Sequence, residues 1–147
     1  MGVPPPGRVA RKHPHRRRFD DAAPRLAGQL DVQNPVVLGE HDAPQPDLAL
    51  LRPRADAYPD HPRAPDTLLV IEVAETTITY DRDVKLPLYA RAGIPEAWLV
   101  NLPAERIEVH REPRAGTYTR VRSLSRGDAL TPVALPDVTL AVTDILG

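Results

Sequence analysis

The sequence contains no cysteine, which excludes a disulfide framework and a thiolate metal site and favours an intracellular, cytoplasmic location. Its five histidines fall into no zinc-ligand spacing, so zinc is not expected. The longest aliphatic stretch, residues 68–71, ends at Glu72, whereas a membrane span needs about 20 apolar residues. The chain is therefore expected to be soluble and to have no membrane partner.

Lysine is almost absent as well, because Lys12 and Lys85 are the only lysines among nineteen basic residues. A lysine ammonium is a compact charge with three rotatable donors, unlike the planar arginine fork, so a lone lysine in an arginine-rich chain suggests a chemical role. Lys85 lies on an expected helical face that is otherwise largely apolar. This face comprises Asp81, Val84, Lys85, Leu88, Tyr89 and Ala92. An ordinary i, i+4 ion pair with Asp81, worth a few tenths of a kcal/mol, is the alternative.

Acidic residues are missing from residues 1–18, which carry six basic residues. The remaining residues hold thirteen basic and twenty acidic side chains. The Pro-rich leader, residues 1–18, has no periodicity and is predicted to be disordered, with residues 19–147 forming one domain. Arg16, Arg17 and Arg18 are candidate nucleic-acid contacts through phosphate neutralisation. Alternatively, residues 1–18 have no structural role and result from a misplaced translation start or a shifted reading frame.

The rest of the chain predicts more strands than helices. Strands are expected at residues 29–38 with a break at Asn34–Pro35, and at 47–51, 67–74, 96–102, 106–111, 118–124 and 138–142. A continuous apolar run such as 67–74 is typical of a central strand that is covered on both faces.

One helix is well indicated, from about residue 81 to 92. Thr77 or Thr79 can serve as its N-cap, Gly93 ends it, and Pro87 predicts a kink or a late start. Residues 19–30 could form a second, short helix, limited by Pro24. The elements together predict an α+β domain, with a mixed sheet and one well-defined helix packed on it.

Two carboxylates stand out against this sheet. Glu72 interrupts the central strand, and a buried, unpaired carboxylate needs a cation, a metal or a raised pKa. Asp47 begins another strand, and neighbouring strands can bring both acids to one edge. Two hard oxygen ligands beside Lys85 suit Mg²⁺-dependent phosphodiester hydrolysis. Each acid also has a purely structural interpretation. Asp47 could be an acid of a turn, Glu72 could pair with an arginine in the core, and Asp81 could be an acid at the start of a helix.

An ordered series of segments resembles the Uma family of restriction endonucleases, which belongs to the PD-(D/E)XK, or restriction-endonuclease-like, superfamily. These segments are QPDLAL at 45–50, VIEVA at 70–74, YDR at 80–82 with Lys85, Leu86, Tyr89 and Ala90, GIPE at 93–96, and Trp98. The resemblance extends from about Val32 to the C-terminus.

The resemblance implies a mixed β-sheet flanked by helices and a metal-dependent endonuclease that cleaves DNA with Mg²⁺ or Mn²⁺. It assigns catalysis to Asp47, Glu72 and Lys85, metal binding to Asp47, Glu72 and Val73, and supporting roles to Asp81 and Tyr89. DNA is the expected partner, and a homodimer is left open.

The sequence also departs from the family pattern. Ala74 occupies the position where the simplest pattern has its lysine, so the ammonium must arrive from the helix at Lys85. Ala43 stands where an acid often precedes the PD element, and Asp20 and Asp21 are the only substitutes for the acid of the superfamily's N-terminal helix. A catalytically impaired nucleic-acid-binding module of the same fold, or a purely structural protein with internally paired acids, is therefore a competing interpretation.

Overall fold

The computed structural model describes residues 16–27, 29–32, 35–39, 42–53 and 61–147. The first fifteen residues of the expected leader lie outside this set. In the described part, no helix is both long enough and apolar enough to cross a membrane.

A six-stranded mixed sheet forms the centre of the domain, with its strands in the order β1-β2-β3-β4-β5-β6. β3 and β4 run parallel, and the other neighbouring pairs are antiparallel. The strands are β1 (Leu30–Val32), β2 (Leu48–Leu51), β3 (Thr67–Ala74), β4 (Glu96–Asn101), β5 (Arg106–Arg114) and β6 (Thr117–Leu124). The predicted α+β architecture with a mixed sheet is confirmed, and β3 has the predicted bounds.

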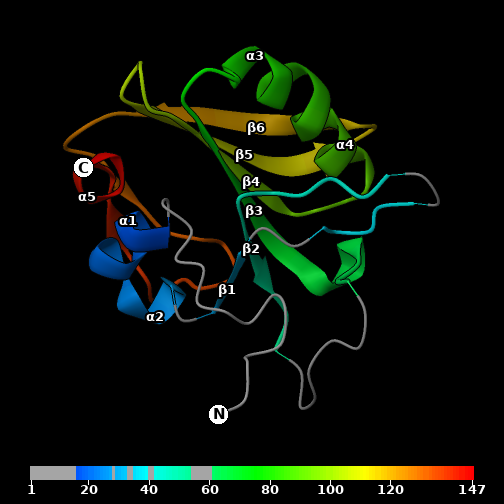
Figure 1. The fold of residues 1–147 in the computed structure, drawn as a ribbon, viewed down its shortest axis with the longest axis horizontal. Coiled ribbons are helices and arrows are strands. Elements are labelled where there is room, and N and C mark those ends of the chain that lie inside the picture. Colours follow the sequence, from blue (N-terminus) through cyan, green and yellow to red (C-terminus); the bar gives the residue numbers. More distant parts are fainter. Residues whose placement is uncertain (1–15, 28, 33–34, 40–41, 54–60) are drawn as a thin grey trace, which may run out of the picture.

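Helices cover both faces of this sheet (Figure 1). One face carries a continuous helical segment made of α3 (Ile78–Tyr80), the π-helical turn η2 (Asp81–Lys85) and α4 (Leu86–Arg91). The other face carries α1 (Arg16–Ala22), α2 (Pro24–Ala27) and α5 (Val142–Leu146). A short 3-10 turn, η1 (Ala64–Asp66), precedes β3, and β7 (Ala129–Leu130) pairs with β8 (Leu140–Ala141) in a separate two-stranded sheet.

Alternation along the strands divides the core into two clusters. Ile71 and Trp98 belong to the cluster beneath α1 and α5, whereas Val70 and Leu99 belong to the cluster beneath α4. Successive strand residues point to opposite faces, and β3 and β4 are buried on both sides, as the continuous apolar run predicted for β3. Glu72 therefore points toward α4, because it shares its face with Val70.

The helix that carries Lys85 contains one widened turn. The Leu86 N–H bonds to the Asp81 carbonyl, five residues back. Pro87 follows immediately, and it has no N–H for an intrahelical bond, so the chain accommodates it at the start of α4. The expected apolar face is consequently shifted. Val84 is 42% exposed, and Leu86 and Ala90 are buried instead.

The N-terminal segment differs most from expectation. α1 begins at Arg16, so the expected boundary at residues 18 and 19 falls inside a helix. Phe19, Ala23 and Leu26 follow an i, i+4, i+7 spacing and are buried against the sheet. Pro24 starts α2 rather than kinking a single helix, which suits its fixed φ and missing N–H.

Candidate active site at the end of strands β2 and β3

Asp47 and Glu72 lie opposite each other where β2 meets β3. The antiparallel register pairs Leu48 with Ile71, and extending it by one position places Asp47 across from Glu72. Directly opposite residues in a sheet project from the same face with Cβ atoms about 5 Å apart. The two carboxylates therefore share the α4 face of the sheet, as the sequence predicted for neighbouring strands.

Pro46 shapes the backbone at this point. Extending the register one further position places Pro46 across from Val73, and proline has no N–H to donate to the Val73 carbonyl. The Val73 N–H donates to Asp47 Oδ2 at 2.7 Å. The N–H and C=O of one strand residue point to the same side, so the Val73 carbonyl is directed toward the Asp47 edge.

Glu72 is 1% exposed, and the helix supplies its two side-chain partners. Tyr89 donates its hydroxyl to Oε1 at 2.6 Å, and Lys85 Nζ lies 3.2 Å from Oε2. Ala74 is fully buried two residues after Glu72, so the ammonium comes from the helix, as the sequence required. Lys85, Tyr89 and Glu72 thus form one cluster between β3 and α4.

These partners do not fully compensate the charge of Glu72. Burial raises its pKa to about 7, although Lys85 and Tyr89 oppose this rise. Asp47 and Asp81 add to it through repulsion between like charges. Burial alone would lower the pKa of Lys85, but Glu72 and then Asp81 hold it above its usual value. The cluster accordingly contains more carboxylate than ammonium.

Asp81 is buried at the start of the π turn. It accepts a hydrogen bond from Thr77 Oγ1 at 2.9 Å, and its Oδ1 lies 3.8 Å from Lys85 Nζ. Burial raises the pKa of Asp81, and the Thr77 and Lys85 contacts counteract this. The i, i+4 ion pair considered from the sequence is present, but Lys85 lies closer to Glu72.

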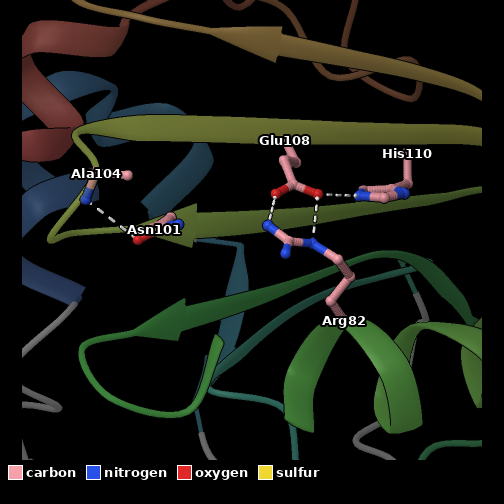
Figure 2. A network of polar contacts seen from close by, with 5 residues as sticks. All are labelled: Arg82, Asn101, Ala104, Glu108 and His110. Atoms are coloured by element: carbon pink, nitrogen blue, oxygen red, sulfur yellow. Dashed lines mark hydrogen bonds and ion pairs between the residues drawn. The ribbon is translucent and has the colours of Figure 1, made fainter. Parts of the chain in front are cut away.

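A second polar network adjoins this cluster and was not identified from the sequence. Arg82, the residue after Asp81, reaches β5 and pairs with both carboxylate oxygens of Glu108 (Figure 2). His110 Nε2 lies 3.1 Å from Glu108 Oε1. Burial opposes the charge of Glu108, but Arg82 and His110 hold its pKa below the ordinary value. Alternation in 106–111 could have placed Glu108 and His110 on one face, but no sequence pattern connects them with Arg82.

The donor set fits a hard divalent cation in its chemistry. Mg²⁺ and Mn²⁺ prefer carboxylate and carbonyl oxygens, which Asp47, Glu72 and Val73 supply at one strand end. Excess negative charge around Glu72 is the electrostatic condition that a cation would relieve. No group of three or more His, Cys, Asp or Glu side chains suited to a metal occurs in the described part of the chain. The fit therefore rests on two carboxylates and one main-chain oxygen.

The remaining candidates lie away from this cluster. Arg18 donates from Nη1 to the carbonyls of Ile145 and Leu146 at 3.1 and 2.6 Å, which ties α1 to α5. Arg17 is exposed, and the side chain of Arg16 lies outside the described set. Asp20 and Ala43 are exposed.

Comparison with known proteins identifies the family of this chain and a structure of similar fold. Residues 11–143 match the family model described as "Uma2: Putative restriction endonuclease". This match begins well before Val32, where the resemblance was expected to start, and includes α1 and α2. No curated protein matches the chain.

Among solved structures, the chain is similar to a crystal structure titled as a putative nuclease belonging to DUF820 from Anabaena variabilis. The TM-score is 0.68 at 15% sequence identity, and the alignment covers 90% of this chain and 78% of the other. At this identity the likeness shows the fold. Because the family model covers most of the sequence, the chain belongs to the Uma2 family of putative restriction endonucleases.

Proposed function

We propose that this domain is a DNA endonuclease that hydrolyses phosphodiester bonds with Mg²⁺ or Mn²⁺ held by Asp47, Glu72 and the carbonyl of Val73. The observation that carries the proposal is the placement of Asp47 opposite Glu72, with Lys85 Nζ 3.2 Å from the Glu72 carboxylate. The family match supports nuclease activity, and the metal and the DNA substrate are the additions made here.

The chain's own residues have distinct roles in this proposal. When bound, the divalent cation would lower the pKa of a water molecule and neutralise charge that develops on the phosphate. Lys85 carries a compact positive charge beside the two acids, where it can orient the attacking water or stabilise the phosphate oxygens. Tyr89 fixes the direction of Glu72 through a 2.6 Å hydrogen bond, and Asp81 lies 3.8 Å from Lys85 Nζ as its second acidic neighbour.

The proposal is tested by incubating the protein with plasmid and linear DNA in EDTA, Mg²⁺ or Mn²⁺. We expect cleavage with either metal and none in EDTA, and we expect Asp47→Asn and Glu72→Gln to abolish it. Glu105→Gln is the matched control, because Glu105 is an exposed acid that pairs with Arg126 instead. Cleavage by Glu72→Gln at the parental rate would refute the proposal.

A DNA-binding module without catalysis is the second candidate. It is favoured by the two contacts that Glu72 already makes within the chain, to Lys85 and Tyr89. Under this alternative the protein would bind DNA, and Mg²⁺ or Mn²⁺ would produce no cleavage.

A further inference from the structure

A pocket of about 200 Å³ lies beside the candidate active site, between α4 and the β5–β6 hairpin. Its wall is mainly apolar and includes Leu86, Pro87, Ala90, His110, Tyr118 and Val121. Drug-sized ligands occupy pockets of about 300–1,000 Å³, so this pocket suits a single ring system.

The pocket adjoins the helical segment that carries Lys85. Lys85 contacts Glu72, and the next residue, Leu86, lines the pocket. The sheet register aligns Glu72 with Leu99 and Leu99 with Glu108. Glu108 in turn contacts Arg82 and His110, whose side chains line the pocket. Two strand spacings separate Glu72 from Glu108, about 10 Å. A strand of nucleic acid at Glu72 would therefore pass close to the pocket.

One polar group of the pocket is the His110 imidazole, which the Glu108 carboxylate contacts. Burial lowers the pKa of His110, although Glu108 opposes this, and a lower pKa favours the neutral ring. A neutral ring that faces Glu108 through Nε2 carries its proton there, which leaves Nδ1 as an acceptor. The His110 and Tyr118 rings meet edge to face at 5.9 Å.

Two arginines lie next to residues that line the pocket. Arg91 Cγ lies 3.8 Å from the position of a Cβ on Gly116, which lines the pocket. Arg114 pairs in the sheet with Thr117, another lining residue. Arg91 and Arg114 are exposed, and neither forms an ion pair with an acid in the described ranges. An apolar interior with exposed arginines on neighbouring residues complements a base that is attached to a phosphate backbone.

We propose that this pocket holds one unstacked nucleobase of the DNA strand whose phosphodiester bond lies at Asp47 and Glu72. The inference rests on the proposed nuclease function. The base contacts the His110 and Tyr118 rings, and an exocyclic amino group donates to His110 Nδ1. Unpaired or weakly paired bases enter most easily, because they have the least stacking and pairing to lose.

The test uses a duplex with a single unpaired 2-aminopurine, whose fluorescence rises when the base leaves the stack, with binding measured in EDTA. We expect a several-fold fluorescence increase and an affinity roughly 5- to 100-fold higher than for the same duplex with an abasic site. Val121→Phe fills the pocket with a ring, and we expect it to remove both effects. Val133→Phe is the matched control, because Val121 and Val133 are 52% and 58% exposed and Val133 lies outside the pocket.

The experiments distinguish a failure of the base-binding proposal from a failure of the nuclease proposal. Equal affinity for the base and the abasic site, or an unchanged fluorescence rise in Val121→Phe, overturns the pocket even if the protein cleaves DNA. Base capture that is lost in Val121→Phe but retained in Val133→Phe supports the pocket, even if no cleavage occurs in Mg²⁺ or Mn²⁺. Absence of any DNA binding overturns both.

Discussion

Among the described residues, each face of the sheet contains one buried glutamate, Glu72 toward α4 and Glu96 toward the opposite side. Both are 1% exposed. Glu96 accepts hydrogen bonds from Trp98 Nε1 at 2.8 Å, Arg111 Nε at 2.8 Å and the Val133 N–H at 2.9 Å. Glu72 has Tyr89 and Lys85, and its pKa rises to about 7 because of burial.

This difference distinguishes a fully paired carboxylate from one whose charge the fold leaves only partly compensated. Glu96 is satisfied by three donors, one of them a guanidinium, and it joins β4, β5 and the segment before β8. Glu72 has two acids as neighbours and one ammonium, so the fold retains a buried charge that it does not fully neutralise. Buried groups with strongly shifted pKa values cluster at functional sites. The core arginine that the sequence suggested as a partner for Glu72 belongs to Glu96 instead.

The largest expected effect is on stability. Glu96→Gln should lower the free energy of unfolding by about 3 to 5 kcal/mol, because it leaves Arg111 without its carboxylate. Glu72→Gln should leave it unchanged or raise it at pH 8, because it relieves repulsion from Asp47 and Asp81. Urea titrations of both variants in EDTA check this, and equal losses would abolish the distinction between the two glutamates.

The next effect is on catalysis. Lys85→Arg should reduce metal-dependent cleavage about 100- to 1,000-fold, because the longer planar fork cannot replace a compact ammonium 3.2 Å from Glu72. Its stability should stay within about 1 kcal/mol of the parent. Arg106→Lys, at an exposed position of β5, is the reverse exchange and should retain activity. Parental cleavage rates in Lys85→Arg would reduce Lys85 to a generic cation.

The pH dependence of stability should also reflect the raised pKa of Glu72. The pKa of Glu72 is 4.5 ordinarily and about 7 in the fold. The folded state therefore binds this proton more tightly, and the associated stability is present below pH 4.5 and lost as the pH rises through 7. The loss amounts to roughly 3 kcal/mol. Unfolding free energies measured from pH 4.5 to 8 in EDTA should show this decline in the parent and not in Glu72→Gln; identical profiles would contradict it.

A smaller effect concerns the face that carries Glu96. Arg18→Met removes two hydrogen bonds to the carbonyls of Ile145 and Leu146, and should cost about 1 to 3 kcal/mol. The exposed neighbour gives the control, since Arg17→Met should change stability by less than about 0.5 kcal/mol. Thermal unfolding of both variants decides whether this arginine serves the fold. Equal melting temperatures would return Arg18 to the set of candidate nucleic-acid contacts.

The sequence predicts the central strands because they depend on local pattern, and it singles out Asp47 and Glu72 as acids at or within predicted strands. Residues 67–74 form a continuous apolar run, and a two-residue alternation fixes which side chains share a face. Glu72 interrupts that run, so its need for compensation could be inferred directly. Lys85 could be identified by its rarity, and its distance to Glu72 follows once the helix covers that face.

Other features depend on tertiary contacts that no local pattern encodes. The apolar residues Phe19, Ala23 and Leu26 stand among arginines, and Pro24 interrupts their spacing. The sequence therefore predicts one short helix at residues 19–30 and a leader that ends at residue 18, in place of α1 and α2. The π turn arises because Pro87 lacks an N–H, and it moves Val84 out to solvent. The Arg82–Glu108 contact joins residues 26 positions apart, and only the packed fold brings them together.

The central claim is that Glu72 is kept in the core to bind a cation and not to hold the fold together. The most direct test is the change in the free energy of unfolding at pH 8 when Mn²⁺ replaces EDTA, measured for the parent and for Glu72→Gln. The parent should gain about 2.7 kcal/mol when Mn²⁺ is present at 100 times its dissociation constant, and Glu72→Gln should gain little. An equal gain in both proteins, or no gain in the parent, would contradict the claim.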